Sequence, residues 1–136
     1  LAKAVTVYES FGAADVPDDG QRYFVVSPAG WADLLQIDQF SRAEYVGESD
    51  LPYAGGLTAK RWLGFMWFTH SGLSKASTTR DCHAYHKSAV GVAMGSDIRT
   101  EINYIPEKVS NLITSYMSLG VVEIDGNGMI ECQITE

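Results

Sequence analysis

Apolar positions near the start of the chain recur every three or four residues and predict a helix over residues 1–11. The residues that share the predicted apolar face are Leu1, Ala4, Val5, Tyr8 and Phe11. Residues 16–20 (VPDDG) then predict a turn, because proline fixes its own φ angle and glycine accepts a positive one.

A strand and a second helix are expected next. Residues 23–26 are apolar without a break, which is typical of a strand buried on both faces of a sheet. Ser27 suits the N-cap of the helix that follows, and Pro28 suits its first position. The buried face of this helix is expected to hold Trp31, Leu34 and Leu35.

The middle of the chain is less periodic. Residues 38–60 are polar and rich in turn-forming residues, and they predict an extended loop. Residues 61–69 carry four aromatic side chains and predict a second strand, whereas residues 71–80 predict a polar hairpin tip or flexible loop. Residues 82–86 predict another strand. The spacing of Tyr85, Ser88, Ala89, Val92 and Ala93 then favours a short helix with small residues on its packing face.

The last third of the chain contains two further expected strands. Residues 98–104 alternate between apolar and polar positions and predict a strand that Pro106 ends. Residues 107–125 fit a helical stripe in their first part and a β-branched strand in their second, so periodicity leaves both possibilities open. Residues 125–128 (DGNG) predict a hairpin turn, and residues 129–134 predict a closing strand.

Composition places the chain among globular domains. With 136 residues, 46% hydrophobic and 20% charged, it is long enough to bury a core without disulfides or metals. Its net charge of −7 and its scattered lysine and arginine residues argue against specific nucleic-acid recognition. No apolar run reaches the ~18 residues of a membrane helix, and neither a signal peptide nor a linker between domains is recognisable.

One cluster of residues could carry metal chemistry. Residues 81–86 (DCHAYH) offer a thiol, imidazoles and a carboxylate. On a strand, however, Cys82 and His86 share one face and His83 points to the other, so a zinc site would need His70 or distant acids. We therefore assign no metal site. Cys82 and Cys132 are interpreted as small buried apolar residues of a reducing compartment, with a disulfide as the alternative.

Other catalytic patterns are missing from the sequence. No serine lies in a G-x-S-x-G elbow, and residues 91–96 (GVAMGS) lack the lysine of a phosphate-binding loop. The glycines at residues 126–128 lie in the predicted turn, with no helix after them to bind an anion. Asp18 and Asp19 lie in a turn and are interpreted as solvated. The sequence gives no catalytic residues and no cofactor, and we expect a protein without enzymatic activity.

An ordered set of short segments nevertheless resembles one family. The segments are VPDDGQRYFVVSP at residues 16–28 with Leu34 and Leu35, FSRAEYVG at 40–47, LGF at 63–65, SGL at 71–73, HKSAVGVA at 86–93, and LGVVEID at 119–125 followed by GMI at 128–130. In this order they resemble the C-terminal half of the major capsid proteins of tailed bacteriophages and prophages. The resemblance covers nearly the whole chain and implies that the chain is part of a longer protein.

The resemblance implies an α+β fold of the Hong Kong-type phage capsid class, with a mixed sheet and a few flanking helices. Residues 1–20 would be the end of the spine helix of the peripheral domain and a turn. Residues 21–104 would form the axial domain, and residues 105–136 would return to the peripheral domain as strands. It thereby favours a strand for most of residues 107–125.

The function implied is that of a structural subunit of an icosahedral shell, which self-assembles into pentamers and hexamers and encloses DNA. Its partners would be other capsid subunits, with scaffold, portal and head-decoration proteins as further candidates, and no membrane. Its location would be the virion, after assembly in the bacterial host cytoplasm. Encapsulin-like compartments share this fold and are not separated from a virus here. We expect Tyr45, Leu51 and Tyr53 of the predicted loop to supply subunit contacts, because they are apolar residues in a polar stretch.

Two alternatives come from the residues alone. The first is a small metal-dependent hydrolase built on the strand that holds Cys82 and His86. The second is a soluble ligand-binding module in which Trp62 and Trp67 line a groove.

Overall fold

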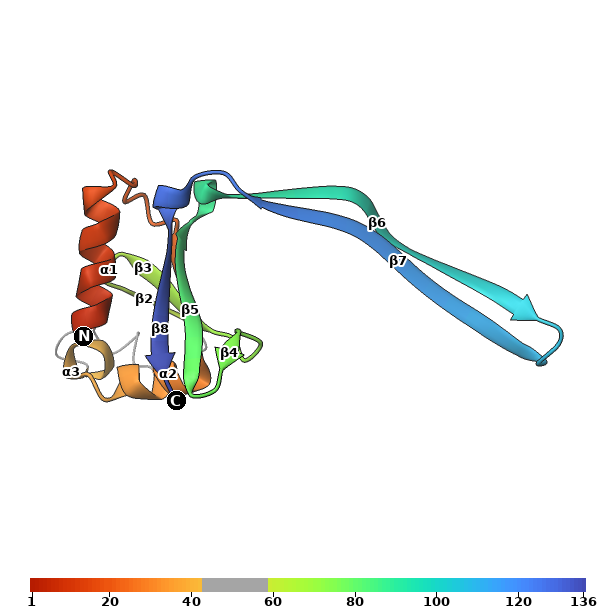
Figure 1. The fold of residues 1–136 in the computed structure, drawn as a ribbon, viewed down its shortest axis with the longest axis horizontal. Coiled ribbons are helices and arrows are strands. Elements are labelled where there is room, and N and C mark those ends of the chain that lie inside the picture. The colour runs from red at the N-terminus through yellow and green to blue at the C-terminus, as the bar shows by residue number, and fades with distance from the viewer. Residues whose placement is uncertain (43–58) are drawn as a thin grey trace. The chain divides into compact units, whose positions relative to one another are not determined.

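The computed structural model describes residues 1–42 and 59–136, which form two compact units. Unit 1 consists of residues 1–89 and 125–136, and unit 2 consists of residues 90–124. Helices α1 (Ala2–Ala13), α2 (Pro28–Leu35) and α3 (Asp38–Ser41) belong to unit 1. So do strands β1 (Arg22–Val26), β2 (Ala59–Trp62), β3 (Phe65–Thr69), β4 (Lys75–Ala76), β5 (Thr79–His86) and β8 (Met129–Thr135), with the short 3₁₀ helices η2 (Lys87–Ala89) and η3 (Gly126–Gly128) (Figure 1).

The first two helices form where the sequence predicts them. Helix α1 buries Ala4, Val7 and Phe11. Val7 therefore lies on its inner face, whereas Val5 and Tyr8, which the spacing predicts there, are not buried. Helix α2 begins as predicted, because the Ser27 side chain accepts a hydrogen bond from the Gly30 amide at 3.1 Å. The additional short helix α3 lies inside the segment predicted to be an extended loop.

A mixed sheet forms the centre of unit 1. Its order is β2-β3-β1-β5-β4, and β8 pairs with β5. Strands β1 and β3 run parallel, and the other pairs are antiparallel. Strand β8 pairs with Thr79–Tyr85 of β5 along one edge, so β1 and β4 share the opposite edge.

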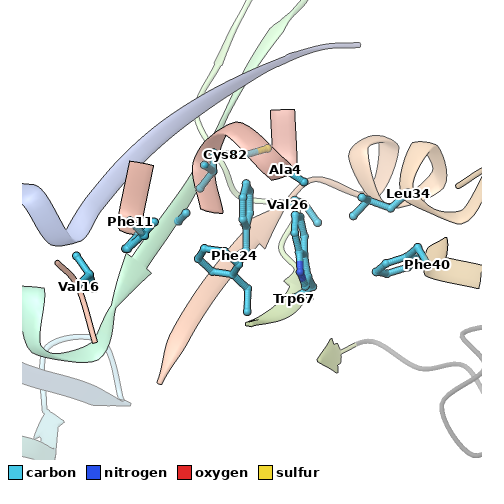
Figure 2. Packing of buried hydrophobic residues seen from close by; sticks show 12 residues of the cluster. Ala4, Phe11, Val16, Phe24, Val26, Leu34, Phe40, Trp67 and Cys82 are labelled. Atoms are coloured by element: carbon cyan, nitrogen blue, oxygen red, sulfur yellow. The ribbon is translucent and has the colours of Figure 1, made fainter. Parts of the chain in front are cut away.

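The core lies on one face of this sheet. Phe24 and Trp67 point to that face and pack with Phe11 from α1 and Leu34 from α2 (Figure 2). Phe65 belongs to the same buried cluster. The rings of Phe24 and Trp67 are stacked, with centroids 4.1 Å apart, and Phe11 meets Phe65 edge to face at 5.3 Å. The helices therefore cover a single face of the sheet.

Two predictions for unit 1 need correction. Strand β1 was expected to be buried on both faces, but Tyr23 and Val25 are only half-buried, because the packed helices lie on the face of Phe24. Residues 61–69 were expected to form one strand, but they contain a hairpin of β2 and β3. Leu63 and Gly64 turn the chain there with φ angles of 52° and 76°.

Unit 2 is a two-stranded antiparallel ribbon. It consists of β6 (Val90–Ile105) and β7 (Ser110–Glu123), which lie side by side along their length (Figure 1). The predicted strand at residues 98–104 is confirmed, and residues 107–125 are mainly a strand, as the family resemblance favoured. The pairing shifts register between Met94 and Arg99.

Two predictions around the ribbon are wrong. The segment 85–93 was expected to hold a short helix, but it forms the end of β5, one 3₁₀ turn and the start of β6. The residues with helical spacing here are mostly small and do not form a strong apolar stripe. Their spacing alone therefore does not distinguish a helix from a strand. Residues 125–128 do turn the chain, but they do not form a hairpin, since β7 pairs with β6 and β8 pairs with β5.

The predicted class, a mixed α+β fold with a mixed sheet and few helices, is confirmed. The two compact units divide the chain after Ala89 and after Ile124. The predicted axial and peripheral regions divide it after residues 20 and 104. Those regions are defined by their places in an assembled shell, so their assignment stays a prediction.

Candidate functional site

The strand that carries the possible metal ligands is β5, and its faces alternate as predicted. Cys82, Ala84 and His86 are buried on the core face, while His83 is half-buried on the other. Among residues 1–42 and 59–136, no group of three or more His, Cys, Asp or Glu side chains is placed to hold a metal ion.

A serine, a histidine and an aspartate come together at one end of β5. His86 Nδ1 lies 2.7 Å from Ser88 Oγ, and His86 Nε2 lies 3.0 Å from Asp19 Oδ1. The hydrogen bond from His86 lowers the pKa of the Asp19 carboxyl below its ordinary value. Ser88 and Asp19 are exposed, and the three hollows described for this structure are lined by other residues. The contact joins the 16–20 turn to η2, which is a structural role.

The two tryptophans of the ligand-groove alternative belong to the core. Trp67 is only 2% exposed, and its indole N–H donates a hydrogen bond of 2.8 Å to the Trp62 carbonyl. Trp62 is half-buried and packs edge to face on Phe40 at 5.3 Å. Because Trp67 is almost wholly buried, it offers a ligand very little surface, and this weakens the groove alternative.

The remaining sequence candidates fall on ordinary structure or outside the described residues. Residues 91–96 lie in β6, and residues 126–128 form η3, which no helix follows. Tyr45, Leu51 and Tyr53, the predicted contact residues, lie outside the described residues, so their role stays a prediction. No helix in the described part of the chain is long and apolar enough to span a membrane.

The most unusual surface of the protein is one face of the β6–β7 ribbon. Even-numbered residues of β6 and odd-numbered residues of β7 share this face, because the two register shifts together restore the alternation. Nine large apolar side chains on it are 50–68% exposed. They are Val92, Met94, Ile98, Ile102, Tyr104, Ile113, Met117, Leu119 and Val121, and we call this set the apolar face.

The opposite face of the ribbon is mostly polar or small. It carries Arg99, Glu101 and Thr114, and the Tyr116 hydroxyl donates a hydrogen bond of 3.1 Å to Glu101. Two charged residues of the strands reach the apolar face: Glu123 at the end of β7, and Asp97, which lies at the register shift and lines the hollow there. The ribbon is therefore amphipathic along its length.

The register shift shapes a hollow in the middle of the apolar face. Met94, Ile98, Met117 and Leu119 line a hollow of about 230 Å³ there, together with Ser96, Asp97 and Ser118. Four large side chains around one depression could receive a protruding apolar residue from a partner. Monomeric proteins rarely expose contiguous apolar patches of this extent, so this face is the candidate interaction site among the described residues.

Sequence reasoning missed this site. The alternation within residues 98–104 was recognised, but residues 107–117 also fitted a helical stripe. The signal that could have revealed the site is the recurrence of apolar residues at odd-numbered positions of β7, namely 113, 117, 119 and 121. A two-residue period on both strands predicts one apolar and one polar face.

A cluster of charges fixes the end of β8 in unit 1. Glu136 forms ion pairs with Lys75 at 3.0 Å and with Arg80 at 3.1 Å. Hydrogen bonds from Ser27, Arg80 and Lys75 lower the pKa of the Glu136 carboxyl from 4.5 to about 2. A depressed carboxyl pKa stabilises the fold above the ordinary pKa, and that stabilisation is lost as the pH falls through the folded-state value.

The Glu136→Gln variant tests this contribution. We expect the wild-type chain to lose stability between about pH 4.5 and pH 2, and the variant to be less stable at pH 7 with a flatter pH dependence in that window. Urea unfolding across the pH range measures both. Glu131→Gln, which changes an exposed carboxylate in β8, should keep the wild-type pH dependence. Equal pH dependence of Glu136→Gln and wild type would refute the assignment.

Two comparisons with known proteins agree with each other. The family described as phage capsid protein matches residues 1–136. Among solved structures, the fold is similar to a chain of the capsid structure of the cyanophage P-SCSP1u, with a TM-score of 0.65 and 18% sequence identity. The match covers 94% of this chain and 44% of the cyanophage chain, so this chain spans less than half the length of that relative. No curated protein matches the chain.

Proposed function

Because the chain belongs to the phage capsid protein family, we propose that it serves as a structural subunit of an icosahedral phage or prophage shell, in which the apolar face of the β6–β7 ribbon binds a second copy. Capsid proteins of this family are structural components of the virion, and the fold here is that of a capsid protein. The observation that carries the proposal is the row of nine exposed apolar side chains.

The ribbon needs a partner on energetic grounds. An isolated two-stranded ribbon is at best marginally stable in water, and β6–β7 has no third strand among the described residues. Among the described residues, β6 and β7 each have one edge that pairs with no other strand. A partner that covers the apolar face would remove its apolar side chains from water and thereby stabilise the ribbon.

The size and charge of the apolar face fit a second copy. Nine side chains that each bury roughly 100 Å² reach the ~800 Å² per partner of a standard specific interface. The chain carries a net charge of −7, so copies repel at long range and must associate through surfaces without charge. Glu123 at one end and Asp97 beside the hollow are the charged residues at this face, so most of its area can meet a second copy without charge repulsion.

A ring requires that the apolar face of one copy bind a different surface of the next copy, because a face that binds its own counterpart stops at a dimer. Head-to-tail contacts between identical subunits make rings when the rotation closes, and pentamers and hexamers are the rings of an icosahedral shell. The acidic chain suits a container that encloses DNA without holding it tightly, because like charges repel at the inner surface. Scaffold, portal and head-decoration proteins remain candidate partners, and assembly in the host cytoplasm is part of the same proposal.

The double variant Ile102→Asp with Ile113→Asp tests the interface. These residues face each other across the strands, and they are 68% and 66% exposed. Charging both should remove about 3 kcal/mol or more per interface, or about a hundredfold in association constant. We expect the complete gene product to stay folded and to form few or no shells, as measured by sedimentation velocity and negative-stain electron microscopy.

The matched control is Leu112→Asp. Leu112 is adjacent to Ile113 and is also apolar and exposed (49%), but it lies on the opposite face. Its replacement should leave the particle yield unchanged. Normal yield from the double variant, or equal loss from the control, would overturn the proposed interface. The single variants Ile102→Asp and Ile113→Asp avoid placing two carboxylates directly opposite each other, so they test the interface if the double variant unfolds.

A further inference from the structure

The two cysteines of the chain, 50 positions apart in sequence, lie opposite each other in the sheet of unit 1. Cys82 of β5 pairs in register with Cys132 of β8 in an antiparallel ladder. Directly opposed residues of such a pair point to the same face, so both thiols lie on the core face with Ala84 and Ile130. Both cysteines are free.

Their geometry suits a covalent bond. Cα atoms of directly opposed residues in an antiparallel ladder are ~4.5 or ~5.5 Å apart. A disulfide requires a Cα separation of ~4.4–6.8 Å, so the register already meets the distance condition without backbone movement.

The two thiols differ in access. Cys82 is fully buried, whereas Cys132 is half-buried and lines two hollows beside the first turns of α1. Lys3 lines both hollows, and its ammonium donates a hydrogen bond of 2.6 Å to the Gln133 carbonyl next to Cys132. Burial raises the pKa of both thiols, and the charge of Lys3 offsets only part of this at Cys132. A small oxidant would therefore meet Cys132 first, and slowly at neutral pH.

We propose that Cys82 and Cys132 form a redox-dependent disulfide across β5 and β8, with a low-molecular-weight disulfide such as oxidised glutathione as the oxidant. The Cys132 thiolate attacks one sulfur of the oxidant, forms a mixed disulfide and releases one small thiol. Cys82 then loses its proton and attacks Cys132 Sγ, which releases the second small thiol. The two protein thiols are oxidised and one molecule of oxidant is reduced to two thiols.

The bond would close a covalent loop around residues 83–131, which contain the whole β6–β7 ribbon. Closing a long loop restricts the unfolded chain most, so the oxidised subunit should resist unfolding. If the chain is a shell subunit as proposed above, the thiols would stay reduced in a host cytosol and oxidise in the surroundings of a released particle. The chemistry itself does not depend on that function.

The reaction can be followed on the purified chain under native conditions. After incubation with oxidised glutathione and alkylation of free thiols, peptide mass spectrometry should find a Cys82–Cys132 link within one chain. Its rate should rise about tenfold per pH unit near neutrality, as the thiolate fraction rises. Thermal unfolding should then occur at a higher temperature, and dithiothreitol should reverse the shift.

Two single variants assign the roles of the cysteines. Cys82→Ser should accumulate glutathione on Cys132, and Cys132→Ser should leave Cys82 unmodified. The proposal is overturned if both wild-type thiols still alkylate after oxidant treatment, if the link joins two chains, or if Cys82 reacts first. Circular dichroism of each variant confirms that it is folded. Since no step involves assembly, failure here would leave the proposed shell function untouched.

Discussion

Replacing Trp67 with alanine is expected to lower the free energy of unfolding of unit 1 by about 3–5 kcal/mol. Trp67 is 2% exposed and lies at the centre of the aromatic cluster, stacked on Phe24 (Figure 2). The change removes the largest fully buried side chain of the described residues and leaves a cavity that the surrounding rings can only partly fill. It also leaves the Trp62 carbonyl without its hydrogen bond from the indole N–H.

Urea unfolding followed by circular dichroism measures this change. Trp67→Phe keeps a ring against Phe24 and should cost clearly less than Trp67→Ala, because much of the volume remains. Tyr8→Ala is the matched surface control: Tyr8 is 40% exposed and meets Phe65 only at a centroid distance of 6.5 Å. A Trp67→Ala variant no less stable than Tyr8→Ala would show that this cluster does not form the core.

Local sequence signals predicted much of unit 1. The helical spacing of Ala4 and Phe11 and the cap formed by Ser27 with Pro28 depend on residues close in sequence, and the corresponding helices form there. The β2–β3 hairpin escaped prediction because Leu63 adopts a positive φ angle that its residue type does not favour. The pairing of β2 with β3 offsets the cost of that conformation, and the sequence of one strand alone does not show with which strand it pairs.

The candidate site was harder to predict than the fold. Whether Ile113 and Met117 lie on a helical stripe or on a strand face depends on the partner strand, and the register with β6 joins residues from separate segments. The sequence of either strand alone does not show that nine apolar side chains form one face. The pairing of Cys82 with Cys132 is likewise a property of the sheet, since 50 positions separate the two residues in the chain.

The second large effect is expected at Arg22. Arg22 is 4% exposed, and its guanidinium donates hydrogen bonds to the carbonyls of Val16 at 2.5 Å and Pro17 at 3.1 Å. It also lies 5.6 Å from the ring centre of Phe11 and 5.9 Å from that of Phe65. The Arg22→Met variant keeps a similar volume but leaves both carbonyls without a donor, which should cost about 3 kcal/mol in unfolding free energy.

Two variants separate this role from a simple loss of charge. Arg22→Lys keeps the charge but loses the planar set of donors that reaches both carbonyls, so its stability should fall between that of wild type and Arg22→Met. Arg42→Met breaks an exposed ion pair with Asp38, at 2.9 Å, and should cost less than about 1 kcal/mol. If Arg22→Met unfolds at the same urea concentration as Arg42→Met, Arg22 does not hold the 16–20 turn on the core. The connection from α1 to β1 would then be held by its other contacts, among them the one between Asp19 and His86 and the hydrogen bond from Arg61 to the Gly20 carbonyl.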